Sequence, residues 1–155
     1  MKTLFIYYSY TGNGDAVAEY LSEKGVETRK VLSEKPLPRS FFMGMMAGGF
    51  LALVKHKSKL VDFDPSVEEY DRVVIGSPIW NGRLSCPINA ALAALSLGDL
   101  PVSFLLYAGG GAAPKAVKRI EKEYPNARVL VLKEPKRNAD ELSRLRALFD
   151  ADGEF

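Results

Sequence analysis

Short apolar runs alternate with amphipathic stretches along most of the chain. The runs predict five strands, over Thr3–Tyr8, Val26–Leu32, Arg72–Ile75, Val102–Tyr107 and Arg128–Leu132. Helical spacing, together with proline and capping signals, predicts helices over Asp15–Lys24, Pro87–Leu97 and Pro114–Glu123, and a final helix with Asn138 as its N-cap. Strands that alternate with helices predict an α/β fold, in which right-handed crossovers place helices on both faces of a parallel sheet.

Residues 33–70 interrupt this alternation. Several prolines break regular structure there, and the longest apolar run of the chain, Phe41–Val54, lies among them. This run is shorter than the about 20 residues that cross a bilayer, so no membrane span is predicted. We expect it to pack on the sheet or to form a homodimer interface, and its basic flanks leave a peripheral membrane contact open. The chain, residues 1–155, is predicted to be one domain with an insertion at about 33–66.

The composition excludes several classes of protein. Apolar residues make up 47% of the chain and the net charge is only +2, so a soluble globular protein is expected. A single cysteine, Cys86, and a single histidine, His56, exclude a disulfide framework and a Cys/His zinc site. The basic clusters Lys55–Lys59 and Lys133–Arg137 are short, and we interpret them as solvated surface rather than a nucleic-acid site. The N-terminus shows no export signal, which predicts a cytoplasmic location.

Three segments with unusual composition follow predicted strands, at the sheet edge where α/β proteins bind ligands. The first segment consists of Ser9, Tyr10, Thr11, Gly12, Asn13, Gly14 and Asp15. Its hydroxyls, its glycines and the free N–H groups of the following helix predict an anion site that needs no lysine. The alternative is a plain turn with Asp15 as the N-cap. The ATP/GTP loop motif is absent, because no lysine lies between Lys2 and Lys24, and the dinucleotide motif has Val17 in place of its third glycine.

The second and third segments supply surfaces for a planar group. The second segment consists of Ser77, Pro78, Ile79, Trp80, Asn81 and Gly82. We predict that Trp80, the only tryptophan, lies on a loop and stacks on a planar ring, with Tyr10 as a second candidate. The third segment begins with Ala108, Gly109 and Gly110, and its bare backbone can approach the polar edge of such a ring. The alternatives are structural packing for Trp80 and a flexible linker for the glycines.

Other reactive side chains do not form a recognisable centre. Cys86 precedes a proline at a predicted helix start, but His56 has no evident acidic partner, so Cys–His catalysis is not expected. The acidic residues between Asp62 and Glu69 do not have the spacing of a calcium loop. We therefore predict no catalytic side chain and no metal site.

Taken together, the three segments resemble the flavodoxin family. The motif Ser/Thr-x-Thr-Gly-Asn, which binds the phosphate of FMN in that family, stands here as Ser9–Asn13, and Gly76–Trp80 resembles the loop beside the flavin ring. The resemblance implies a doubly wound sheet of five parallel strands in the order 2-1-3-4-5, with FMN as the cofactor. Two departures are visible. Gly14 stands where the family commonly has a threonine, and the chain is slightly basic whereas flavodoxins are acidic.

The resemblance leaves three functions open. The leading hypothesis is an electron-transfer protein that uses FMN and exchanges electrons with a redox protein or a small acceptor. The alternative is an NAD(P)H-dependent oxidoreductase that acts on quinones, nitro compounds or related acceptors, with Phe41–Val54 as a dimer interface. The third is a flavin-free interaction module. In the leading hypothesis the flavin supplies the redox chemistry, so no acid or base from the chain is required.

Overall fold

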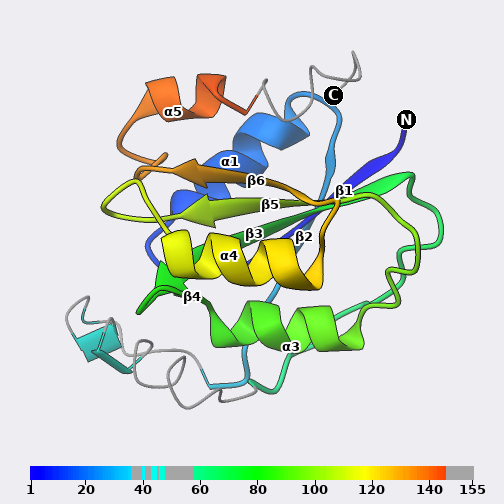
Figure 1. Ribbon diagram of the computed structural model, residues 1–155, viewed down its shortest axis with the longest axis horizontal. Coiled ribbons are helices and arrows are strands. Elements are labelled where there is room, and N and C mark those ends of the chain that lie inside the picture. The colour runs from blue at the N-terminus through cyan, green and yellow to red at the C-terminus, as the bar shows by residue number, and fades with distance from the viewer. Residues whose placement is uncertain (36–39, 41–42, 45, 48–57, 146–155) are drawn as a thin grey trace.

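A computed structural model describes residues 1–35, 40, 43–44, 46–47 and 58–145 of the protein. Five parallel strands form its centre, in the spatial order β2-β1-β3-β5-β6 (Figure 1). Their bounds are β1 Thr3–Tyr7, β2 Glu27–Lys30, β3 Arg72–Trp80, β5 Val102–Tyr107 and β6 Arg128–Leu132. The expected parallel α/β sheet is therefore present, and its five parallel strands follow one another in the predicted spatial sequence.

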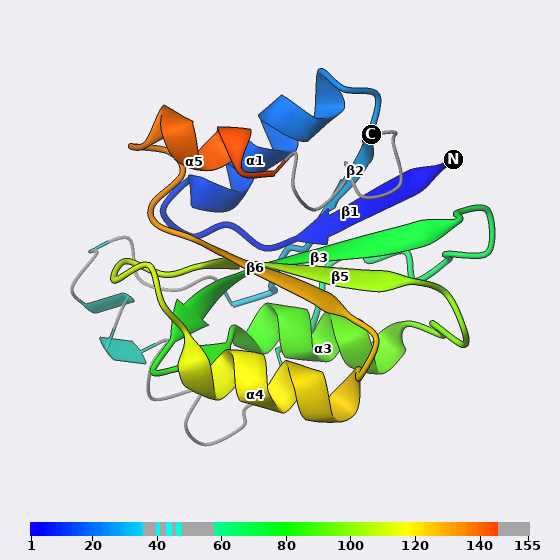
Figure 2. The same cartoon turned by 45° about the horizontal axis from the view of Figure 1, so that its top comes forward.

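Helices cover both faces of this sheet. Their bounds are α1 Asn13–Ser22, α3 Cys86–Ala94, α4 Pro114–Glu123 and α5 Ala139–Ser143. Figure 2 shows α1 and α5 on one face and α3 and α4 on the other. Each face has its own apolar core, because side chains alternate between the faces along every strand. Phe5, Val74 and Leu105 pack towards α1, whereas Leu4 and Phe104 belong to the core below α3 and α4.

The strand count differs from the prediction. A sixth strand, β4 Arg83–Leu84, pairs antiparallel with the end of β3, so that β3 continues to Trp80 instead of ending at Ile75. Asn81 and Gly82 both have positive φ, of 50° and 72°, which fits a two-residue hairpin turn. The interpretation of Ser77–Trp80 as a loop is therefore wrong, because the Asn-Gly turn draws these residues into the sheet.

Two helices, α1 and α3, have other bounds than predicted. The first helix begins at Asn13 with Gly12 as its N-cap, so Asp15 lies inside the first turn and is not the cap. Helix α3 ends at Ala94 rather than Leu97, and residues 95–97 continue in extended or irregular backbone. Helix α4 has the predicted bounds, with Pro114 in its first turn.

The insertion leaves and rejoins the fold at one place. Ser33 and Leu60 form an antiparallel bridge, and two backbone hydrogen bonds flank it, Glu34 N–H to the Lys59 carbonyl at 3.0 Å and Val61 N–H to the Leu32 carbonyl at 3.0 Å. Most of Phe41–Val54, the predicted dimer interface, lies outside the described residues. Among the helices that the structure describes, none combines the length and the apolar character needed to cross a membrane.

Candidate functional site

The carboxyl ends of the parallel strands gather several connecting segments at one edge of the sheet. Figure 1 shows the segments after β1, β5 and β6 and the β3–β4 hairpin on this same side. The chain passes from β1 outward to β2 and then back across β1 to β3. Such a reversal of strand order leaves a crevice beside the ends of β1 and β3, where doubly wound proteins hold their ligands.

The first segment forms a tight turn that leads directly into α1. Gly12 adopts a left-handed conformation, with φ 92° and ψ 0°, which favours glycine. Ser9 Oγ accepts a hydrogen bond from the Asp15 N–H at 3.2 Å, and Thr11 Oγ1 accepts one from Asn13 Nδ2 at 3.1 Å. Both hydroxyls act as acceptors in these bonds, and the hydrogen of the Thr11 hydroxyl remains available to donate to a ligand.

The opening of α1 also supplies backbone donors. The first intrahelical bond runs from the Ala16 N–H to the Gly12 carbonyl at 3.1 Å, so the amides of Asn13 and Gly14 precede the regular ladder. These amides and the positive end of the helix dipole favour an anion at this point. The predicted anion site therefore has both hydroxyl and amide donors in one turn.

Gly14 is required by packing. A Cβ at this position would lie 2.9 Å from the Tyr8 carbonyl oxygen and 3.0 Å from both Ser9 Cβ and Tyr7 Cδ2. Real Cβ atoms do not approach backbone oxygen this closely, so a larger residue would push the turn away from β1. The threonine that is common in the flavodoxin family does not fit here, and its hydroxyl is replaced by a closer contact between the helix and the strand.

The carboxylate of Asp15 is held by other side chains. Lys30 Nζ lies 2.7 Å from Asp15 Oδ1, and the Tyr7 hydroxyl donates to the same oxygen at 3.3 Å. Burial by itself would raise the pKa of Asp15, but hydrogen bonds from Lys30 and Ser9 outweigh it and hold the pKa below its ordinary value. The negative charge closest to the turn is therefore compensated by Lys30.

Trp80 is a core residue and does not present a free face. Its side chain is only 8% exposed, and the rings of Tyr8 and Tyr10 meet it edge-on at centroid distances of 5.7 and 6.2 Å. Ser77 is fully buried, and its hydroxyl contacts Ser85 at 3.2 Å while accepting the Ser85 N–H at 3.0 Å. In this structure Trp80 therefore packs in the core, which is the alternative that the sequence left open for it.

The rest of the second segment differs in accessibility. Pro78 and Ile79 are half-buried in β3, whereas Asn81 is exposed and Gly82 half-buried at the tip of the hairpin. The tip therefore brings a short piece of accessible backbone to the edge of the sheet. Sequence reasoning placed the whole segment there, but only this turn extends beyond the strand ladder.

The third segment leaves open backbone at the edge. Ala108 is buried and anchored, with its N–H donating to the Leu132 carbonyl at 3.0 Å, but Gly109 and Gly110 are exposed. A Cβ at either glycine would meet nothing within 4 Å, and neither residue has a positive φ. Nothing in the described part of the chain therefore requires glycine at these two positions, and a group that approaches the bare backbone would explain them.

A residue that the sequence analysis did not select also reaches this edge. The N–H of Lys136 donates to Asn13 Oδ1 at 3.1 Å, and Lys136 Nζ lies 3.5 Å from the Thr11 carbonyl. Lys136 belongs to the basic cluster that was interpreted as solvated surface. Its position after β6 was the available signal, because every segment that follows a parallel strand of this sheet reaches the same edge.

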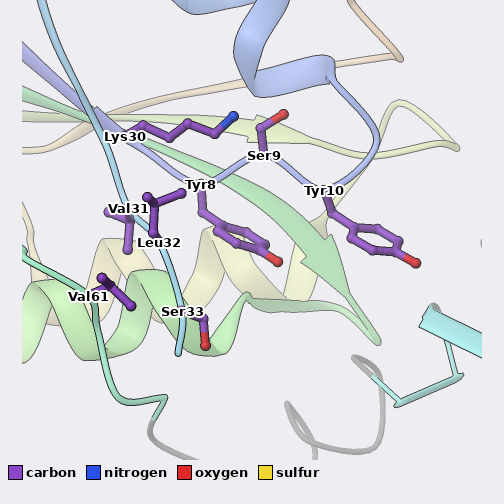
Figure 3. Close-up of a pocket in the computed structure, with 8 residues that line it drawn as sticks. All are labelled: Tyr8, Ser9, Tyr10, Lys30, Val31, Leu32, Ser33 and Val61. Carbon is purple, nitrogen blue, oxygen red and sulfur yellow. The ribbon is translucent and has the colours of Figure 1, made fainter. Parts of the chain in front are cut away.

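A cavity of about 380 Å³ lies on the β2 side of the first segment (Figure 3). Figure 3 shows the rings of Tyr8 and Tyr10 extending to the same side of the sheet. Burial raises the pKa of Tyr8 to about 12, so its hydroxyl stays protonated. The cavity was not predicted, since its walls come from the residues that follow β1, from the end of β2 and from the ends of the insertion. The residues that line it are Tyr8, Ser9, Tyr10, Lys30, Val31, Leu32, Ser33 and Val61.

The remaining reactive groups do not form a second centre. Cys86 is 1% exposed and burial raises the pKa of its thiol, as expected of a packed residue rather than a nucleophile. His56 lies outside the described residues. Within the described ranges, no group of three or more His, Cys, Asp or Glu side chains is placed to hold a metal ion.

Comparisons with known proteins agree with this architecture. Residues 1–140 match the family described as NADPH-dependent FMN reductase. No curated protein matches the chain. Among solved structures, a protein from Bacteroides eggerthii described as a flavoprotein has a TM-score of 0.71 at 18% identity, with 95% of this chain and 96% of that chain covered. One from Bacteroides uniformis has a TM-score of 0.70 at 20% identity, with 94% and 97% covered.

A third solved structure is a flavoprotein from Lactobacillus acidophilus in complex with FMN. It has a TM-score of 0.63 at 24% identity, with 92% of this chain and 98% of that chain covered. At these identities the structural likeness shows the fold alone. The flavodoxin-like fold that the sequence resemblance implied is thereby confirmed.

Proposed function

The chain belongs to the NADPH-dependent FMN reductase family, and on that premise we propose that it is an oxidoreductase that takes electrons from NAD(P)H through FMN and passes them to a small acceptor. The observation that carries the proposal is the family match, which extends over residues 1–140 and includes every segment of the candidate site. The electron-carrier hypothesis receives no specific support, whereas the reductase alternative agrees with the family.

The residues at the edge fit FMN. The first segment offers hydroxyl and amide donors that suit a phosphate, because Thr11 can donate and the amides of Asn13 and Gly14 point out of α1. Gly109 and Gly110 leave space for a planar group beside bare backbone. FMN carries a terminal phosphate and a planar redox ring, and these two features match the two parts of the edge.

The chain's contribution is to bind and orient the cofactor. FMN supplies the hydride chemistry when bound. The amides of Asn13 and Gly14 would hold the phosphate, and the backbone at Gly109 and Gly110 would lie along the ring. The buried Tyr8 and Trp80 pack edge-on against each other and support the first segment from the core. No side chain of the site needs to transfer a proton in this scheme.

The proposal is tested by mixing the FMN-loaded protein with NADPH or NADH under anaerobic conditions. We expect the yellow absorbance of the oxidised flavin to disappear within seconds to minutes, because the cofactor would accept the hydride directly. Free FMN at the same concentration serves as the control for the uncatalysed reaction. No bleaching until a separate reductase is added would support the carrier instead, and a protein that binds no FMN would support the flavin-free module.

A further inference from the structure

The connection between β6 and α5 crosses onto the first segment and is tied to it. The backbone N–H of Lys136 donates to Asn13 Oδ1 at 3.1 Å, a contact between residues 123 positions apart in the chain. The other end of the same residue lies against the same turn, with Nζ 3.5 Å from the Thr11 carbonyl oxygen. Lys136 is therefore held at both its backbone and its ammonium group beside the turn that opens α1.

The shape of the turn makes room for this side chain. A Cβ on Gly12 would lie 2.8 Å from Lys136 Nζ and 3.0 Å from its Cδ, so the aliphatic stem and ammonium lie directly over the glycine. Gly12 has the left-handed φ of 92°, which already disfavours a side chain there. The side chain of Lys136 thus occupies the space that a side chain at Gly12 would need.

No acidic side chain of the described residues neutralises the ammonium group of Lys136. The N-terminus of α1 carries a partial positive charge, which repels a neighbouring ammonium. Lys30, the other lysine near the turn, is paired with Asp15 at 2.7 Å, and Glu134 of the same connection is paired with Arg137 at 3.4 Å. Among the ion pairs of the described residues, none includes Lys136. A phosphate dianion at the turn would reverse the sign of the interaction.

We propose that the ammonium group of Lys136 binds the phosphate of FMN. This inference rests on the proposed function, since it assigns a further residue to the same cofactor site. The backbone bond to Asn13 holds the connection in place, and the flexible stem lets Nζ exchange its long contact with the Thr11 carbonyl for a charge-assisted bond to phosphate oxygen. The ion pair with Lys136 then contributes to the difference between the protein's affinity for FMN and its affinity for riboflavin, which has no phosphate.

The test measures FMN and riboflavin binding separately, by quenching of flavin fluorescence on titration with the apoprotein. The variants are Lys136→Gln, Lys136→Arg and, as a matched charge control, Lys122→Gln in the exposed last turn of α4. Lys136→Gln should weaken FMN about ten- to a hundredfold, which is the range of hydrogen bonds to charged groups. Riboflavin should change less than about twofold, Lys136→Arg should restore most of the FMN affinity, and Lys122→Gln should change neither ligand.

The salt dependence of flavin binding supplies a second measurement. FMN binding should weaken as salt is raised, riboflavin binding should not, and the salt dependence should be smaller in Lys136→Gln. Because Lys136 is exposed, its replacement leaves the core intact. The proposal is overturned if Lys136→Gln leaves FMN affinity unchanged or weakens both flavins equally. A wild-type protein that binds neither flavin would instead refute the proposed function.

Discussion

Replacing Tyr107 with phenylalanine should make the protein more stable. Tyr107 ends β5, and its hydroxyl is buried with no hydrogen-bond partner among the described residues. Its hydroxyl lies against Gly76 of β3, where a Cβ would collide with the hydroxyl oxygen and come within 2.6 Å of the Phe5 ring. Burial raises the pKa of Tyr107 well above its ordinary value, and the nearby Tyr7 and Asp15 add to the shift.

The size of the effect follows from the cost of an unsatisfied buried polar group. A buried hydroxyl without a partner costs about 1–3 kcal/mol relative to water, and phenylalanine removes it while keeping the ring. The lost oxygen leaves a gap smaller than a methyl group, so little packing energy is lost in return. The free energy of unfolding of Tyr107→Phe should therefore rise by about 1–2 kcal/mol, which is about 2–4 °C in Tm for each kcal/mol in a chain of this size.

Urea unfolding of the apoprotein, followed by circular dichroism, measures this change. A higher midpoint with an unchanged slope is expected. Tyr70→Phe is the matched control, because Tyr70 is also buried but its hydroxyl donates to Glu27 Oε1. The control should lose stability, since it leaves a carboxylate without its donor. If Tyr107→Phe loses as much stability as the control, the hydroxyl has a partner such as a buried water, and the reasoning fails.

Three further predictions concern the site. Thr11→Ala should weaken FMN binding by about 1.5–3 kcal/mol and leave riboflavin nearly unaffected, because only the phosphate is a charged acceptor; equal losses in fluorescence titrations would place the phosphate elsewhere. Trp80→Ala should lower the free energy of unfolding by about 3–5 kcal/mol, as for a core tryptophan, with Trp80→Phe milder; a purely surface-like loss in urea titrations would contradict its burial. Asp15→Asn should be less stable than the wild type above about pH 4. Because folding lowers the pKa of Asp15 from 3.8, its stabilisation is lost as the pH falls through the folded-state value, so the gap between the two proteins should narrow in acid; a gap that widens would refute the pairing with Lys30.

The parts of the fold that depend on local signals were predictable. The apolar runs locate the parallel strands, and Pro114 marks the start of α4 at the residue where the helix begins. The turn Ser9–Asn13 was also found, since its glycine and hydroxyls occur together between a strand and a helix. These features are encoded within a few neighbouring residues, so no knowledge of the tertiary structure is needed.

The sequence analysis was wrong or incomplete at the site where the structure depends on contacts between distant residues or on two overlapping sequence signals. The Asn81-Gly82 pair is a hairpin signal, but the apolar run before it was ended too early, and Trp80 was therefore assigned to a loop. The contact of Lys136 with the first segment joins parts of the chain that only the sheet brings together. The contact of the Tyr107 hydroxyl with Gly76 likewise depends on strand register, which places Pro78 opposite Tyr107 and Gly76 two residues before Pro78 on the same strand.

The bridge between Ser33 and Leu60 has a consequence for how this protein can vary. Because backbone hydrogen bonds join the two ends of the intervening segment, the length of that segment does not set the distance between β2 and β3. Doubling the length of a flexible loop whose ends are joined costs only about 0.6 kcal/mol of additional loop-closure free energy. Insertions and deletions between Ser33 and Leu60 should therefore be tolerated without rebuilding the parallel strands.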